Sequence, residues 1–484
     1  MQAEWLQTFN NMYFFFMLVA YPLSIRNSYF DISLTKLVFF YTISLLFIVA
    51  NIGLRVVGLI TKAENGEVPM PLAEKILLGL LSVSVLITFL VNGSYKRNFI
   101  AIDEPEMSIV FLGICIIVYY FIRRAPVNKT LFAACAIIGS AAVSAIAVLQ
   151  FFGYDPGNIM AIADMDGPSF MSTLSNRDLI GFYFSAMLPF GFYVATQKKW
   201  IAVGAIGCAL TELGIIVCDT DAAIACFGAE LVLLVIFCAH DKGFKLGYPI
   251  CLIAMGIAHT LTGYYWLDVQ PATHLSYICT LMIHPYVGMF LIGAGVVFLG
   301  LLHFVHPMVM KGLAIFAFVF ILAYPIYIYY YTQYRVGMPA DTSLPYDSFL
   351  YFRQEWGSGR GFLWMITVGI FKENDLLTKL IGLGAQEYPN KYILYCMNHE
   401  EFAKRLVFPY YDAHNMYLHF LVVYGIIGLT AGMAFIIYRV VSLLRTKEED
   451  CFYRVKGVAF LTAMISAVFL FCSNISMAFL PLLL

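Results

Sequence analysis

The chain has 484 residues, of which 61% are hydrophobic and only 12% are charged, and its mean hydropathy is +0.81. A water-soluble domain cannot bury so much apolar surface, so lipid must be the solvent for most of the chain. The formal net charge is −1 and no basic tract is present, so nothing in the sequence indicates a nucleic-acid partner.

The apolar residues are gathered in long uninterrupted runs, as expected when backbone groups in hydrocarbon satisfy their own hydrogen bonds within helices. We therefore predict an all-α, polytopic transmembrane helix bundle with about 12 or 13 spans, in a single membrane domain covering residues 1–484. Residues 474–484 either extend the last span or form a re-entrant piece. The runs lie, in chain order, near residues 12–25, 34–54, 72–91, 107–122, 130–152, 179–195, 200–217, 222–239, 248–267, 286–305, 312–331, 416–438 and 456–473.

Basic residues alternate between the loops that join these runs. One set of loops is basic, whereas the intervening short loops carry aspartates and a single basic residue, Arg177. The basic residues are Arg123, Arg124, Lys129, Lys198, Lys199, Lys242, Lys245, Lys311, Arg439, Arg445, Lys447, Arg454 and Lys456, and the aspartates are Asp155, Asp164, Asp166, Asp219, Asp221 and Asp268. The positive-inside rule makes the first set cytoplasmic and the second external. By parity the long polar stretch, residues 332–415, is a large extracytoplasmic loop. We expect it to bear a half-buried helix at residues 362–371 and one or two amphipathic helices within residues 387–405.

The polar stretch ends in Asp412, Ala413, His414 and Asn415, at the start of another apolar run. An unperturbed imidazole has a pKa near 6.5 and exchanges protons readily at neutral pH, which makes His414 the leading candidate for a base. Asp412 is close enough in sequence to orient the ring or to stabilise its charge, and we count Asp412 and Asn415 among the candidate substrate-binding residues. The alternative is that His414 and Asn415 only cap the turn into the helix.

Two arginines are candidates for binding an anion. Arg360 is flanked by glycines that allow close approach of a ligand, and its guanidinium matches phosphate oxygens. Arg177 stands at the N-terminus of a predicted span, where anions bind well. The alternatives are that Arg360 reaches to the lipid headgroups and that Ser175 or Asn176 caps the helix, with Arg177 paired to Asp178.

Several acidic and basic groups lie within or between the predicted spans. Asp219 and Asp221 share an external turn, where they could bind a cation, orient sugar hydroxyls, act as a base or simply form the turn. Glu212, Glu230 and His259 fall inside spans, where ionisable groups are functional candidates unless they are paired internally.

The order of several short motifs resembles the O-antigen ligase and O-antigen polymerase family. The likeness is diffuse over the first third of the chain and good from about Ser172 to Gly428. Its elements are Ser175-Asn176-Arg177 before a helix that contains Pro189, Ser358-Gly359-Arg360 followed by Trp364, Gly382 and Gly384, and then His414, Asn415, Tyr417, Leu418, Gly425 and Gly428.

This resemblance implies an inverting bacterial membrane glycosyltransferase that works at the outer face of the cell membrane, among the membrane lipids. It would transfer an undecaprenyl-diphosphate-linked oligosaccharide to a hydroxyl of a glycan or lipid-linked acceptor, without a nucleotide sugar, cofactor or required metal. By resemblance, His414 matches a histidine thought to act as base and Arg360 an arginine thought to hold the diphosphate. Many members carry an arginine where this chain has Asp221, so either Arg177 replaces it or Asp221 serves the acceptor.

Two questions stay open at the level of sequence. A polymerase joins lipid-linked chains to one another and a ligase transfers them to another acceptor; the replaced arginine slightly favours a polymerase. A transporter or flippase of lipid-linked oligosaccharides is the alternative class, and it should show pseudo-repeats and charges at the midplane of the membrane. No internal repeat is visible, and the large loop that ends in His414 favours chemistry. A non-catalytic membrane scaffold is the remaining possibility.

Overall fold

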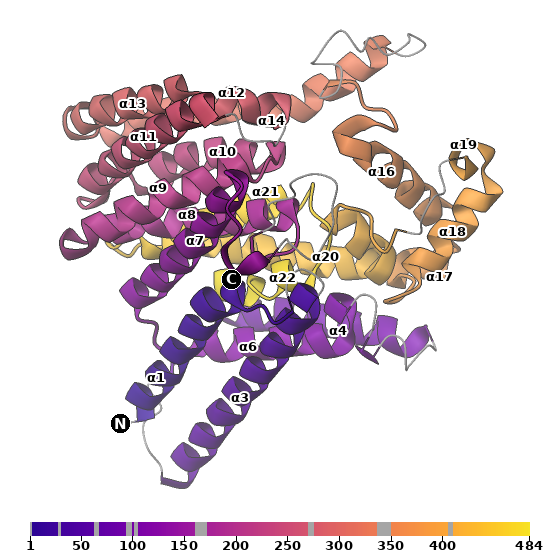
Figure 1. Ribbon diagram of the computed structural model, residues 1–484. Helices are drawn as coiled ribbons and strands as arrows, with labels where there is room; N and C mark the ends of the chain where they lie inside the picture. Colours follow the sequence, from indigo (N-terminus) through magenta and orange to yellow (C-terminus); the bar gives the residue numbers. More distant parts are fainter. Residues whose placement is uncertain are drawn as a thin grey trace.

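The computed structural model describes residues 2–27, 31–61, 67–92, 99–100, 105–159, 172–269, 275–335, 350–404 and 410–484, and every regular element among them is helical (Figure 1). Ten of these helices have at least 18 residues and are apolar enough to cross a membrane, which confirms the predicted all-α polytopic bundle. They are α3 (Ile32–Thr61), α4 (Leu72–Val91), α7 (Lys129–Phe151), α8 (Arg177–Thr196), α9 (Ile201–Val217) together with the 3-10 turn Lys198–Trp200 that leads into it, α10 (Asp221–Cys238), α11 (Phe244–Val269), α13 (Pro285–Phe304), α14 (Pro307–Arg335) and α20 (Met416–Leu444).

Two of the three remaining apolar runs form the shorter helices α6 (Ile109–Arg124) and α21 (Phe452–Ser466). The run predicted near residues 12–25 is divided between the end of α1 (Gln2–Phe15), a π-helical turn (Phe16–Ala20) and α2 (Tyr21–Leu23). The last run was predicted to extend to residue 473, and this C-terminal boundary is wrong, because α21 ends at Ser466 and a turn follows. The hydroxyl of Ser473 then caps a new helix by accepting a hydrogen bond from the backbone N–H of Ile475 at 3.2 Å. The tail therefore does not extend the span, and it forms the short buried helices α22 (Asn474–Met477) and α23 (Leu480–Leu483).

Within the predicted loop at residues 332–415, four helices are described, and they stand at the right of the bundle in Figure 1. The predicted half-buried helix is the middle of α16, and the predicted amphipathic helices are α18 and α19. The loop begins later than predicted because α14 continues to Arg335. Asp164, Asp166, Arg405 and residues 336–349 lie outside the described residues. The four helices are α16 (Trp356–Glu373), α17 (Leu376–Ile381), α18 (Tyr388–Asn398) and α19 (Glu400–Ala403).

Helix α8 forms the centre of the bundle, and its side chains are buried from Leu179 to Ala195. Helices α7, α9, α10, α11 and α21 pack around it, while α3 and α14 stay largely open to the surroundings (Figure 1). Small residues allow the backbones to approach closely, since a Cβ at Gly204 of α9 would lie 2.6 Å from the carbonyl oxygen of Gly191 in α8. Close packing through small residues is typical of helix association in membranes.

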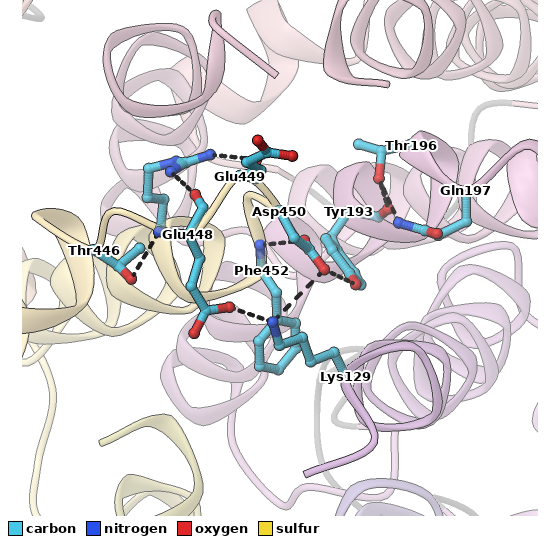
Figure 2. A network of polar contacts seen from close by, with 10 residues as sticks. Lys129, Tyr193, Thr196, Gln197, Thr446, Glu448, Glu449, Asp450 and Phe452 are labelled. Atoms are coloured by element: carbon cyan, nitrogen blue, oxygen red, sulfur yellow. Dashed lines mark hydrogen bonds and ion pairs between the residues drawn. The ribbon is translucent and has the colours of Figure 1, made fainter. Parts of the chain in front are cut away.

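A polar network fixes the start of α21 against α7 and α8 (Figure 2). The hydroxyl of Tyr193 donates to Asp450 Oδ2 at 3.0 Å, and the other oxygen of Asp450 accepts from the N–H of Phe452 at 2.9 Å. Lys129 forms an ion pair with Glu448 in the same network. These contacts set the position of α21 at one end, and thereby the position of the turn that follows its other end.

Helix α20 is broken at Gly425, which has φ 69° and ψ −175°. The break exposes two carbonyl groups, and the segment after α17 satisfies both. Leu383 N–H donates to Val422 O at 2.9 Å, and Gly384 N–H donates to Val423 O at 3.0 Å. The loop helices are thus attached by backbone hydrogen bonds to the first part of α20. Glycine suits positions 384 and 425 because their φ angles are 86° and 69°.

We expect Gly425→Ala to destabilise the protein. The backbone conformation at this position is available essentially to glycine alone, at a cost of about 1–3 kcal/mol for other residues. A Cβ there would also collide with the carbonyl oxygen of Leu380. The measurement is the thermal unfolding midpoint in detergent. Gly293→Ala is the control, because a Cβ at Gly293 meets nothing within 4 Å; equal midpoints for the two variants would contradict the prediction.

Candidate functional site

The candidate base is held in an unusual backbone conformation by its own neighbour. His414 has φ 48°, in the left-handed region that few side chains adopt. Asp412 Oδ1 accepts hydrogen bonds at 2.8 Å both from the His414 backbone N–H and from its ring Nδ1. Because an ionised carboxylate can only accept, Nδ1 is the donor in this contact, and in the neutral imidazole the lone pair is then on Nε2. The imidazole is about one-third exposed (32%).

Asn415 serves as the N-cap of α20. Its side-chain oxygen accepts from the backbone N–H groups of Tyr417 and Leu418, each at 3.0 Å. This is the capping role that the sequence analysis gave as an alternative, and it engages the side-chain oxygen of Asn415. The cap sets the direction of α20 immediately after His414 and so helps to fix the imidazole.

Arg360 lies in the first turn of α16, where Gly357, Ser358 and Gly359 adopt left-handed conformations. Its guanidinium donates to three oxygens: Nη2 to Asp178 Oδ2 at 2.6 Å, Nη1 to Gly357 O at 2.9 Å and Nε to Phe469 O at 3.0 Å. The side chain is 15% exposed. The guanidinium is therefore fixed in place, and the carboxylate of Asp178 already occupies one of its donors.

Arg177 is the first residue of α8, and its partner differs from the predicted one. Its Nη1 pairs with Asp219 Oδ2 at 2.7 Å, whereas the neighbouring Asp178 pairs with Arg360. The sequence analysis gave a pair of Arg177 with Asp178 only as an alternative to anion binding, and the two side chains instead have these separate partners because successive helix residues point in different directions. Asn176 does cap α8, since its side chain accepts from the Asp178 N–H at 2.8 Å.

The two aspartates of the 218–222 turn hold the start of α12 (Tyr277–Met282). Asp219 Oδ1 accepts from the backbone N–H of Ser276 at 2.6 Å, and Asp221 Oδ1 accepts from the Ser276 hydroxyl at 3.2 Å. Asp221 also interacts electrostatically with Arg360. Asp221 thus lies at the same end of the bundle as the two arginines, with one oxygen engaged by a serine.

One turn, formed by residues 467–473, connects Arg360 to the histidine. Phe469 O accepts from Arg360 Nε at 3.0 Å, and Cys472 N–H donates to Asp412 Oδ2 at 2.6 Å. Asp412 in turn holds His414. A continuous series of direct contacts therefore runs from Asp178 through Arg360 and the turn to the imidazole, although these residues are far apart in the sequence.

Aromatic rings fill the space around these contacts. Trp364 stacks on Phe469 with ring centroids 6.1 Å apart, and its indole N–H donates to the His414 carbonyl at 3.4 Å. Phe471 lies 5.2 Å from the His414 ring. Trp356 also contacts Phe469 but is only 6% exposed, so it mainly serves packing.

An apolar cavity of about 150 Å³ lies between α4, α6, α20, α21 and the tail. Met416 and Cys472 line it, directly beside Asn415 and within the turn, and Gly432 and Leu484 line it further along. The cavity therefore starts next to the segments that hold His414 and continues into the membrane-spanning part of the bundle. Its walls suit a hydrocarbon chain.

Two groups at the site were missed by sequence reasoning. Asp178 was considered only as a partner of Arg177. Nothing in the sequence around Asp178 indicated that its side chain would pair with Arg360 of α16. The turn at 467–473 was assigned to a span because its residues are apolar, and it acts through backbone groups. The ionisable groups within the spans are partly paired internally: His259 Nδ1 lies 2.6 Å from Glu212 Oε1, with both residues buried.

No three His, Cys, Asp or Glu side chains in the described part of the chain are grouped so that they could hold a metal ion. Residues 275–433 match the family model described as O-antigen ligase, which confirms the resemblance derived from the motifs. No curated protein matches the chain. The matched region includes Arg360, Asp412, His414 and Asn415, while Arg177, Asp221 and the 467–473 turn lie outside it.

Proposed function

We propose that this multi-pass membrane protein with an O-antigen ligase domain is an inverting glycosyltransferase of surface polysaccharide synthesis. The donor would be an undecaprenyl-diphosphate-linked oligosaccharide and the acceptor a sugar hydroxyl. The main support is that Arg360 and the Asp412–His414 pair both bind the 467–473 turn. A phosphate-binding fork and a proton acceptor are the two groups that this transfer requires.

In the proposed reaction, Nε2 of His414 removes the proton of the acceptor hydroxyl as its oxygen attacks the anomeric carbon of the donor. A new C–O bond forms on the face opposite the diphosphate, and the bond from the anomeric carbon to the diphosphate oxygen breaks. The electron pair of that bond leaves with undecaprenyl diphosphate, so the anomeric configuration inverts. Asp412 keeps the Nδ1 proton in place and stabilises the imidazolium that forms.

Arg360 would compensate the charge that develops on the leaving diphosphate. In the structure its Nη2 is bound by Asp178 at 2.6 Å, so the diphosphate would have to displace that carboxylate or share the guanidinium with it. Nε and Nη1 stay bound to the backbone oxygens of Phe469 and Gly357, which keeps the guanidinium oriented during the exchange. Arg177, paired with Asp219, is the second candidate cation.

The site would face the outside of the cell. This proposal is supported by the distribution of basic residues over the loops, which by the positive-inside rule favours an external position for Arg177, Asp221 and the 332–415 segment. The apolar cavity would then receive part of the isoprenoid chain of the donor, with the diphosphate near Arg360. Asp221 stands where many members of the resembled family have an arginine, and this difference slightly favours a polymerase over a ligase.

We expect Gly432→Leu to weaken binding of donors with a long isoprenoid chain. A leucine side chain at this cavity wall would exclude about two or three CH₂ groups, at about 0.8 kcal/mol each, so the donor KM should rise about tenfold or more. A donor with a short lipid chain should be unaffected. Gly293→Leu is the matched control, because Gly293 has open space around it. An equal change for both donors would argue against the cavity as the lipid site.

The direct test uses the purified protein in liposomes with one lipid-linked oligosaccharide. A polymerase elongates this single substrate, whereas a ligase forms product only when a second acceptor is added. Movement of the donor across the bilayer without a new glycosidic bond would instead support a transporter. Absence of transfer with every acceptor would refute the proposed function.

A further inference from the structure

The turn formed by residues 467–473 lies outside the region that matches the O-antigen ligase family model. It interrupts an apolar run, and the protein places it against the first turn of α20. Met416 N–H donates to Ala467 O at 3.0 Å, and the Tyr417 hydroxyl donates to Met464 O at 2.6 Å. These two contacts attach the end of α21 directly after His414.

The same turn binds both parts of the candidate site through its backbone. Phe469 O accepts from Arg360, and Cys472 N–H donates to Asp412, with only two residues between these attachment points. Asp412 is 7% exposed, so its carboxylate has few opportunities to find a replacement donor in water. The separation of the guanidinium and the imidazole therefore depends on the conformation of four consecutive residues.

We propose that the 467–473 turn is a positioning element that sets the distance between Arg360 and His414. The proposal rests on the proposed function for its kinetic consequences, although the geometry can be tested without it. Asp412 bridges the turn and the base: Oδ2 accepts from Cys472, and Oδ1 accepts from the His414 ring and backbone. Removing the Cys472 N–H would free the carboxylate to rotate, and the imidazole would lose its orientation.

The informative substitution is Cys472→Pro, because proline has no backbone N–H. Cys472→Ala loses the same thiol and keeps the N–H, so it is the reference against which Cys472→Pro is measured. A hydrogen bond to a charged group contributes enough to predict a fall in kcat of about 10- to 100-fold relative to Cys472→Ala. The donor KM should change less than about threefold, because Arg360 keeps its contact with Phe469 O. An unchanged kcat in folded Cys472→Pro would overturn the proposal.

A second variant covers the case in which proline prevents folding. One glycine inserted after Leu470 keeps every N–H and carbonyl but lengthens the path between Phe469 and Cys472. We expect kcat to fall and the donor KM to rise in this variant, since the two attachment points no longer have the same spacing. A merely structural role would lower the thermal unfolding midpoint while leaving kcat and KM of the folded fraction unchanged, and that result would also overturn the proposal.

Accessibility of the imidazole separates this inference from the proposed function. Diethylpyrocarbonate modifies histidine, and peptide mass spectrometry follows His414 individually, with His303 as internal reference. The rate at His414 should change about threefold or more in Cys472→Pro relative to Cys472→Ala, while the rate at His303 stays constant. If wild type transfers no sugar but this change occurs, the proposed function fails and the positioning role stands. An unchanged modification rate at His414 would contradict the positioning role, whatever the sugar-transfer activity of the variant.

Discussion

Replacing His414 is expected to slow sugar transfer strongly while leaving the donor bound. General base catalysis contributes about 10²- to 10⁴-fold, so kcat should fall by that factor and the donor affinity should stay near that of wild type. Asparagine is the better first replacement. His414 has φ 48°, and asparagine adopts this left-handed conformation more readily than alanine, so His414→Asn removes the imidazole with little backbone strain.

The measurement is single-turnover transfer from a lipid-linked donor in liposomes, together with donor binding. His414→Ala should lose activity to the same extent and additionally show a lower unfolding midpoint. His303→Ala serves as control, because the His303 ring is exposed and bonds to the carbonyl of Leu299 one turn before it in α13. If His414→Asn transfers sugar at the wild-type rate, the assignment of His414 as base fails.

The sequence predicted the fold well because span recognition depends on composition over about 20 residues. The length and hydropathy of each apolar run were enough to locate the ten long helices. Asp412 and His414 could also be related from the sequence, because an aspartate two residues before another residue readily accepts from its backbone N–H. The location of the long helices and the Asp412–His414 contact both depend on residues that are close together in the sequence.

The rest of the site depends on contacts that no local pattern encodes. The Arg360–Asp178 pair joins residues 182 positions apart in the sequence, and Arg177 joins Asp219 across 42 positions. The 467–473 turn was hidden for another reason: it acts through an N–H and a carbonyl, which almost every residue possesses, inside a run of apolar side chains. Only the packing of α21 against α8 and α20 shows where that run must break.

The second large effect is expected at the arginine. Arg360→Lys keeps the positive charge but loses the planar fork, so it cannot bind Asp178 Oδ2, Gly357 O and Phe469 O together as the guanidinium does. Loss of charge-assisted hydrogen bonds to the diphosphate should raise the donor KM by about 10- to 100-fold. Arg445→Lys, at the far end of α20, controls for the substitution itself. An unchanged donor KM would exclude a bidentate phosphate contact.

Asp178 provides a second test of the phosphate contact, in which tighter donor binding is expected, whereas Arg360→Lys should weaken it. If the diphosphate displaces the Asp178 carboxylate from Nη2, then Asp178→Asn removes the competing anion and the donor should bind more tightly than to wild type. If Asp178 instead only holds Arg360 in position, Asp178→Asn should weaken donor binding in the same direction as Arg360→Lys. The double variant identifies the case: under competition, the gain from Asp178→Asn should shrink in the Arg360→Lys background, because the bond that Asp178 occupies is then already lost.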